Sequence, residues 1–310
     1  MDSSIGRSSI SHFPVLRGRR HHVRAWATSA DAGAPLLFLL HGWGDVSASF
    51  QFVVDALQRS WRVIAPDWRG FGLSWDVDAS GAAEQAYWFP DYLADLEAVL
   101  MHYQPHGQVT LVGHSMGGNV ACLYAGVRPE RVRAVVALDA FGLPARPADE
   151  APGRLAQWLD QLAAPQGFRR YADRQAFVAR LMRDNPRLRA DRAAFLAEHM
   201  LLAATDGGWR VAIDPAHRHV NPVPYRRAEA LACWRRVQAR VLWVEQADPA
   251  WRRRLGLDDA SHAEGAACFA RLERAWLAGT GHNMHHDQPE RLAQLIEQFV
   301  TGDTDERAAG

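Results

Sequence analysis

Ser115 stands between Gly113 and Gly117 in the segment LVGHSMGGNV, directly after the apolar run VTLV. A G-x-S-x-G pattern at a strand-to-helix junction is typical of a sharp, strained turn that exposes a serine hydroxyl as a nucleophile. The flanking glycines are needed there because strand and helix pack so closely that side chains would collide. A random match occurs on the order of once in ten chains of this length. The strand predicted before the motif and the helix after it favour the nucleophile.

A second glycine-rich segment, LLHGWGD at 39–45, follows another predicted buried strand. Acyl transfer at a serine needs two N–H groups aimed at the developing oxyanion. In this arrangement, one donor is the residue after the nucleophile, Met116, and the other comes from the loop after the earlier strand, here Trp43. Gly42 and Gly44 let that backbone turn inward.

The elements that must position these groups form an alternating series. Apolar strands and amphipathic helices alternate up to residue 142, which predicts an α/β fold with a mostly parallel central sheet covered by helices on both faces. From 143 to 236 the rhythm stops, prolines recur and amphipathic helical pieces dominate, so we expect an inserted helical cap. The pattern resumes at 237–300 and completes the core begun at 1–142. The tail, 301–310, is expected to be disordered.

Composition limits the kind of partner. The chain has 310 residues, of which 48% are hydrophobic, and its 35 basic and 35 acidic residues balance. No net charge favours nucleic acid or an anionic membrane, so a small, largely uncharged molecule is the expected partner. The three cysteines are scattered, and the N-terminus has no signal-peptide core, which favours a cytoplasmic, soluble protein. A monomer or a homodimer fits equally well.

Taken in order, the segments HGWGD, DWRGFGLSW, GHSMGG and GTGHNMHHDQPE resemble the α/β-hydrolase superfamily, and the resemblance spans almost the whole chain. It implies a triad of serine, acid and histidine, a helical cap after the strand AVVALDA, and no metal or organic cofactor. The insertion at 143–236 falls where that cap belongs.

His282 is the expected base of the triad. It follows GTG after the last predicted strand, where a loop reaches back over the end of the sheet, and the expected chain order is serine, acid, histidine. The segment HNMHHD offers a rival interpretation, with His282, His285, His286 and Asp287 as metal ligands. The absence of a cysteine or a second acidic cluster there weighs against a metal.

Two aspartates compete for the acid. Asp248, after the strand VLWVEQ, matches the usual acid of the superfamily, although the usual glycine three residues earlier is Glu245 here. Asp139, at the end of AVVALDA, matches an alternative acid position used by some relatives. We expect Asp248, with Asp139 as the alternative.

Serine at the elbow predicts ester hydrolysis, because relatives that open epoxides or remove halide use an aspartate there. Aromatic residues expected near the end of the sheet and in the cap predict an apolar site. The residues expected to contact the substrate are Trp43, Phe141, Trp158 and Tyr171. Two other functions stay open: a C–C bond hydrolase of a diketone, and a ligand-binding protein with little turnover.

Overall fold

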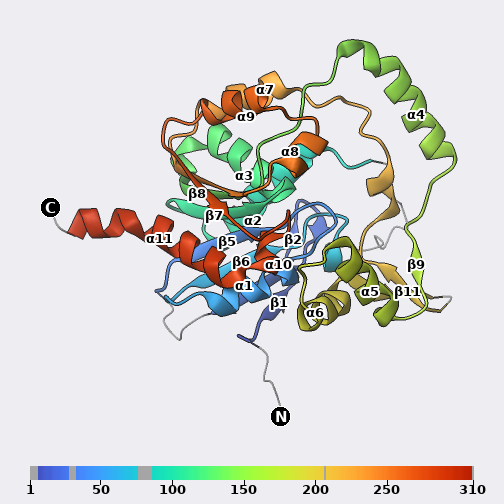
Figure 1. The fold of residues 1–310 in the computed structure, drawn as a ribbon, viewed down its shortest axis with the longest axis horizontal. Coiled ribbons are helices and arrows are strands. Elements are labelled where there is room, and N and C mark those ends of the chain that lie inside the picture. Colours follow the sequence, from blue (N-terminus) through green and yellow to red (C-terminus); the bar gives the residue numbers. More distant parts are fainter. Residues whose placement is uncertain (1–5, 28–32, 76–85, 206, 309–310) are drawn as a thin grey trace.

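The computed structural model describes residues 6–27, 33–75, 86–205 and 207–308, the last six without their side chains. An eight-stranded sheet runs through the centre of the molecule (Figure 1). Six neighbouring strands, β6, β5, β7, β8, β12 and β13, run parallel to one another. At one edge, β4 pairs antiparallel with β6, and β1 pairs antiparallel with β4. In spatial order the strands are β1 (Ile10–His12), β4 (Val23–Ala27), β6 (Arg62–Pro66), β5 (Leu36–Leu40), β7 (Val109–His114), β8 (Val132–Leu138), β12 (Arg240–Gln246) and β13 (Leu272–Leu277). The predicted α/β architecture is confirmed.

Helices cover both faces of this sheet. One face carries α1 (Gln51–Ala56), α10 (Met284–Asp287) and α11 (Pro289–Ala308). The other carries α2 (Phe89–Tyr103), α3 (Met116–Val127), α7 (Arg227–Trp234) and α9 (Asp259–Ala266). Helix α11 continues to residue 308, so the expectation of a disordered tail from 301 is wrong for the backbone of 301–308. Short elements complete the core: the hairpin β2 (Val15–Leu16) and β3 (Arg19–Arg20), helix α8 (Ala250–Arg254), and 3-10 turns at 47–50, 72–74 and 129–131.

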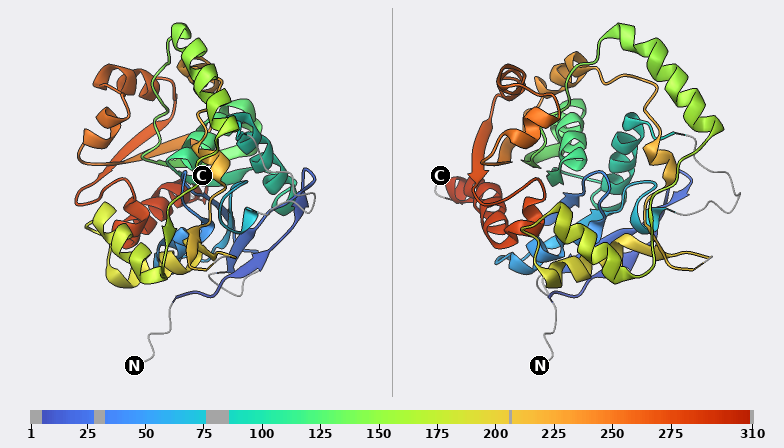
Figure 2. Two further views of the ribbon diagram at one scale, coloured as in Figure 1. Left: turned by 90° about the vertical axis from the view of Figure 1, so that its right-hand side faces the viewer. Right: turned by 45° about the vertical axis from the view of Figure 1, so that its right-hand side comes forward.

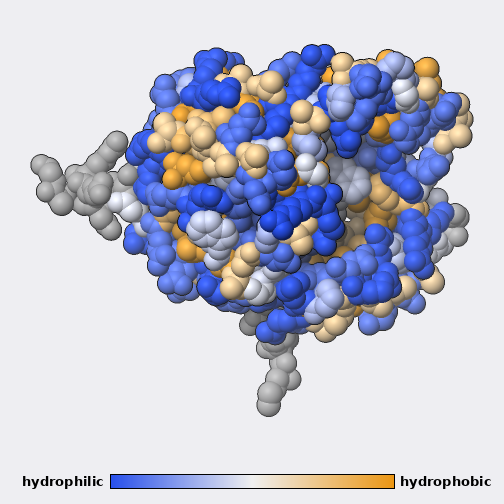
Figure 3. Space-filling model, turned by 45° about the horizontal axis from the view of Figure 1, so that its top comes forward, coloured by the Kyte–Doolittle hydropathy of each residue, from blue (hydrophilic) through white to orange (hydrophobic). Residues whose placement is uncertain are grey.

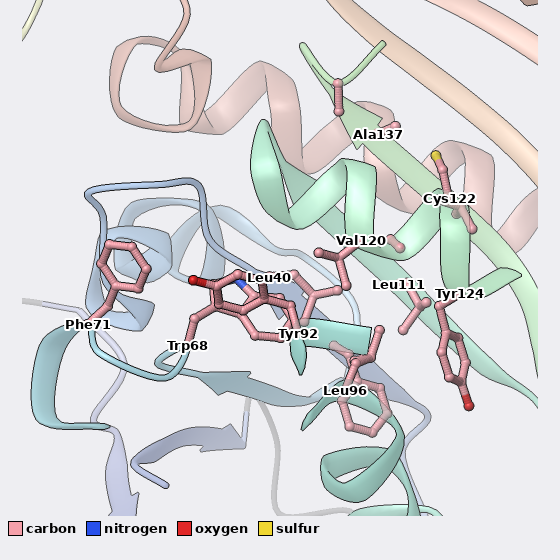
Figure 4. Packing of buried hydrophobic residues seen from close by; sticks show 14 of the residues in the cluster. Leu40, Trp68, Phe71, Tyr92, Leu96, Leu111, Val120, Cys122, Tyr124 and Ala137 are labelled. Carbon is pink, nitrogen blue, oxygen red and sulfur yellow. The ribbon is translucent and has the colours of Figure 1, made fainter. Parts of the chain in front are cut away.

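The inner strands β5, β6, β7, β8 and β12 bury both of their faces, which explains their largely apolar runs, whereas the edge strands β1 and β13 are mostly exposed. In β5, Leu37 and Leu39 pack under α1 and α11, while Phe38 and Leu40 pack under α2 and α3. Figure 4 shows the second of these layers, where side chains from the helices meet those of the sheet. All four β5 side chains are fully buried, so the sheet is a rigid frame for the loops at its carboxyl end.

The insertion after β8 contains three helices, α4 (Ala151–Ala163), α5 (Arg174–Asp184) and α6 (Ala190–Met200). It also contains a small antiparallel sheet of β9 (Arg170–Tyr171), β11 (Trp209–Val211) and β10 (Leu201–Ala203), and 3-10 turns at 148–150 and 215–218. Strands of two or three residues are too short for periodicity to reveal, so they were not predicted. Helix α4 stands away from the sheet in every view (Figures 1 and 2) and buries none of its residues.

Helix α7 was assigned to the cap, and the structure corrects this boundary. It packs on α3 so tightly that a Cβ added at Gly126 would lie 2.0 Å from the carbonyl oxygen of Cys233. Its first residue, Arg227, is buried at the base of the cap, near Leu143, where the inserted segment begins. The Arg227 guanidinium donates to the Leu143 carbonyl (3.3 Å) and to the Ser261 carbonyl, and it pairs with Glu264 at 3.4 Å. The insertion therefore spans 143–226.

Alanine substitution at Gly117, beside the turn from β7 into α3, should destabilise the protein, whereas the same substitution at Gly153 should not. A Cβ at Gly117 would lie 2.2 Å from the main-chain oxygen of Leu40, which cannot move aside. Gly117→Ala should therefore lower the free energy of unfolding by roughly 1–3 kcal/mol or more, measured by chemical denaturation. Gly153→Ala in α4 is the matched control, because nothing lies within 4 Å of that position and alanine favours a helix. Equal stability of the two variants would contradict the packing argument.

Candidate active site

Ser115 occupies the turn between β7 and α3 with a strained backbone, φ 50° and ψ −113°. Its N–H donates to the carbonyl of Leu138 in the neighbouring strand β8 (2.8 Å), which holds the turn in place. A non-glycine residue in such a conformation costs on the order of 1–3 kcal/mol, and such residues cluster at functional sites. The side chain is half-buried at the carboxyl end of the sheet, as the motif predicted.

The loop after β5 lies against this turn. A Cβ at Gly42 would come within 3.2 Å of the Ser115 Cβ, so only glycine allows the approach. His41 is buried and shapes the loop: its Nε2 accepts from the Trp68 N–H (2.9 Å), and its Nδ1 donates to the Gly42 carbonyl (2.7 Å). Burial lowers the pKa of His41, which keeps the ring neutral in this tautomer. The loop geometry is therefore set before any ligand arrives.

The backbone N–H of Met116 follows Ser115 at the first position of α3. The N–H of Trp43 follows Gly42, where an added Cβ would lie 3.2 Å from the Ser115 Cβ. Neither donates a hydrogen bond to another residue in the part of the chain that the structure describes. Two free N–H groups beside a nucleophile are what an oxyanion requires.

His282 lies in the loop between β13 and α10. Its carbonyl accepts from His114 Nε2 (2.8 Å), the side chain directly before Ser115. Burial, followed by the nearby His285 and His282, lowers the pKa of His114, so this ring is a neutral donor. The His282 ring stacks on Trp251 with a centroid separation of 4.3 Å. No direct hydrogen bond joins the Ser115 hydroxyl to His282, and hydrogen bonds between a nucleophile and its base often tighten only when substrate binds.

Asp139 is the carboxylate that contacts His282. Its Oδ2 lies 3.1 Å from His282 Nδ1, and because a carboxylate only accepts, Nδ1 carries the proton and leaves Nε2 as the free base. Like Ser115, Asp139 has a positive φ (45°), and the two are neighbours at the ends of β7 and β8. The Asp139 side chain is almost fully buried and also accepts two hydrogen bonds from Gln246.

Asp248, the expected acid, does not make this contact. Its carboxylate is exposed and accepts from the N–H of Ala250 (2.9 Å), at the start of α8. Pro249 precedes that helix, and no hydrogen bond or ion pair joins Asp248 to His282. The geometry corrects the preference for Asp248 in favour of the alternative, Asp139.

The other residues of the HNMHHD segment form a separate buried cluster. His285 and His286 approach Asp45 at 3.1 and 3.9 Å, and donor atoms of the three lie within 4.8 Å of one another, so they are the residues that could hold a metal. This group differs from the rival metal-ligand set weighed in the sequence, because His282 contacts Asp139 and Asp287 accepts from the N–H of Gly281 (2.8 Å). Burial lowers the pKa of His286 to about 3. Asp45 also accepts from Ser49. Through Asp45 and His285 this cluster joins the loop after β5 to helix α10.

Trp43 is shared by the linings of two small cavities. One cavity, of about 220 Å³, is bordered by Met116 and by aromatic residues of the core. The other, of about 200 Å³, is lined by Phe168 and other apolar residues of the cap. The Trp43 side chain is 52% exposed, which fits the prediction that it meets the substrate.

The other three expected substrate contacts lie elsewhere. Tyr171 is buried inside the cap, against Phe177, and its hydroxyl bonds Arg180. Phe141 is buried behind Asp139, and Trp158 lies half-buried on α4. None of the three lines either cavity beside Trp43.

A larger apolar groove of about 720 Å³ runs between α2, α3 and the segment 220–226, and includes Phe89 and Leu123. Figure 3 shows the surface hollowed on the side where α4 stands, with apolar residues in the recess. The groove shares Phe89 and Asn221 with the Met116 cavity. Leu123 lies seven residues after Met116 on α3, so the groove extends about 10 Å along the helix from the site.

Residues 35–252 match the family of the alpha/beta hydrolase fold. The chain belongs to the α/β hydrolase fold family. A serine hydrolase-like protein of Danio rerio is 29% identical over 94% of this chain and 92% of its own length. Epoxide hydrolase B of Mycobacterium tuberculosis is 32% identical, over 51% of this chain and 44% of its own.

Solved structures share the fold across the whole chain. A hypothetical protein of Pseudomonas aeruginosa PAO1 superposes with a TM-score of 0.77 at 26% identity, covering 96% of this chain and 99% of its own. A thioesterase domain from the curacin biosynthetic pathway gives 0.79 at 24% identity, covering 93% and 99%. This α/β hydrolase therefore carries Ser115 and His282 on a frame shared with hydrolases. No described helix is both long and apolar enough to cross a bilayer.

The two aspartates of this α/β hydrolase can be separated by one substitution each. Asp139→Asn should lower kcat for p-nitrophenyl acetate by several orders of magnitude, because an amide at this position favours the wrong histidine tautomer. Asparagine tolerates positive φ, so the turn should survive. Asp248→Asn should leave kcat within about twofold of the wild type, as expected for an exposed residue away from the site. A large loss of kcat in Asp248→Asn, together with a small loss in Asp139→Asn, would show that Asp248, in the loop after β12, is the acid.

Proposed function

We propose that this protein is a serine hydrolase that cleaves small, largely apolar carboxylic esters through an acyl-serine intermediate. Ser115 is the nucleophile, His282 the base and Asp139 the acid. The observation that carries the proposal is the hydrogen bond of His282 Nδ1 to the buried Asp139, with His282 packed on His114, the residue directly before the strained Ser115.

The first half of the reaction forms the acyl-serine. His282 Nε2 takes the proton of the Ser115 hydroxyl while the oxygen attacks the ester carbonyl. The resulting oxyanion accepts hydrogen bonds from the N–H groups of Met116 and Trp43. The imidazolium then gives its proton to the departing alkoxide, and the C–O bond of the ester breaks.

The second half releases the acid. Water gives a proton to His282 Nε2 and attacks the acyl carbonyl, and Ser115 leaves as its proton returns. Asp139 keeps its negative charge throughout, because its role is to hold the tautomer and stabilise the imidazolium. A serine elbow supports acyl transfer and not epoxide opening, even though one relative is an epoxide hydrolase.

The cavities support a small, apolar substrate. Each cavity beside Trp43 is below the 300–1,000 Å³ that holds a typical drug-sized ligand. Acyl and alcohol groups are therefore expected to occupy one cavity each. Phe168 lines one cavity and His217 and Val220 line the other, so the cap shapes both. The insertion therefore sets selectivity while the core supplies every reacting group.

The nucleophile is tested by Ser115→Ala. The variant should lose p-nitrophenyl ester turnover and labelling by a fluorophosphonate probe, because the oxygen that forms both bonds is gone. Circular dichroism should match the wild type, since alanine occupies the same turn. Wild-type protein that takes up no label, or a variant that still turns over, would overturn the assignment.

Trp43→Ala tests the residue that the two cavities share. Removing the indole should merge the two cavities and raise kcat/KM for long relative to short acyl esters by roughly 10–200-fold. Phosphonate labelling should persist, because the N–H at position 43 remains. Trp276→Ala, which removes an exposed tryptophan outside both cavities, should leave the chain-length profile unchanged. A Trp43 variant with the wild-type profile would show that the indole does not limit the substrate.

A further inference from the structure

The end of β12 holds the acid at two points. Gln246 donates from its backbone N–H to Oδ1 of Asp139 (3.1 Å) and from its side-chain Nε2 to Oδ2 (2.6 Å). The second bond ends on the same oxygen that faces His282 Nδ1 at 3.1 Å. Both oxygens of the carboxylate are therefore engaged by one residue of the neighbouring strand.

The preceding residue anchors this strand end. Glu245 is buried, and its carboxylate pairs with Arg274 of β13 (2.9 Å) and with His262 of α9 (2.8 Å). Burial alone would raise the pKa of Glu245, but His262 and Arg274 outweigh it and lower the pKa. The N–H of Asp139 also donates to the carbonyl of Val244 (2.9 Å). Glu245, at the place where the family pattern has glycine, thus fixes the backbone that presents Gln246.

The carboxylate needs such a restraint. The last side-chain torsion of an aspartate is broad and twofold, so packing alone sets its plane weakly. Three donors, two from Gln246 and one from His282, favour one orientation of the carboxylate.

We propose that Gln246 is a positioning residue that turns Oδ2 of Asp139 toward His282 and keeps it there. This inference rests on the proposed Ser115–His282–Asp139 function. It places the nucleophile on β7, the acid on β8 and the restraint of the acid on β12, where the usual acid of the family belongs.

Gln246 acts from behind the triad. With Asp139 and Asp248 it lines a polar cavity of about 300 Å³, which includes neither Ser115 nor the oxyanion residues Trp43 and Met116. A substrate on Ser115 therefore does not touch Gln246, and a loss at this position should appear in kcat and not in KM.

The test replaces the amide by groups of similar size. Gln246→Met removes the donor without adding charge, and kcat for p-nitrophenyl acetate should fall roughly tenfold or more with KM unchanged. The acid limb of the pH profile of kcat/KM should move to higher pH. Without the amide donor, the negative charge of Oδ2 is less shared and stabilises the protonated His282 ring more strongly. Gln246→Glu should lose more activity at pH 8, since two adjacent carboxylates repel. Gln294→Met, at an exposed glutamine of α11, is the control.

Thermal melts establish whether each variant is folded. If Gln246→Met does not fold, the isosteric Gln246→Glu variant tests the same role. A folded Gln246→Met enzyme with wild-type kcat and an unmoved acid limb would overturn the positioning role. An effect confined to KM would overturn it too, by placing Gln246 against the substrate. A wild-type enzyme that shows no Ser115-dependent turnover would instead refute the proposed function, so the two failures are distinguishable.

Discussion

The close approach of α3 to β5 and β7 is the constraint on which the site depends. Added Cβ atoms at Gly113 and Gly117 would meet main-chain atoms at 2.5 and 2.2 Å, so the helix can start this close to the sheet only without side chains there. That proximity forces Ser115 into its strained turn. The same contact sets the first N–H of α3 beside the loop after β5. The proposed nucleophile and the proposed oxyanion donor Met116 thus depend on one packing contact, and neither could be moved without the other.

The rest of the site is assembled around this turn by short links between loops. His114 fixes the carbonyl of His282, and Asp45 joins the loop after β5 to the loop before α11. Asp139 reaches the base from the neighbouring strand. Because His114, Asp45 and Asp139 are all buried, these links hold the loops around Ser115 in place within the fold.

Features of the fold that depend on a short stretch of sequence could be predicted from the sequence alone. Unbroken apolar runs identified the strands, and the elbow glycines identified Ser115, because both reflect packing within one segment. The choice between Asp139 and Asp248 was different: both follow strands, and only the folded structure shows which one contacts His282. The boundary at α7 was missed for a similar reason, since helical periodicity does not say against which neighbour a helix packs. Tyr171 was expected at the substrate because an aromatic residue in the core of a cap looks the same in sequence as one in its lining.

The contacts of Arg227 at the base of the cap affect how freely the length and sequence of the cap can vary. Its contacts with Leu143 and with the core hold the two ends of 143–226 together, independently of what lies between them. The entropy lost on closing a chain segment grows only with the logarithm of its length, about 0.6 kcal/mol for each doubling. Lengthening, shortening or exchanging the inserted segment therefore costs the core little stability. The cap is the part of this chain on which selection for a new substrate can act most freely, while the sheet and its strained turns stay as they are.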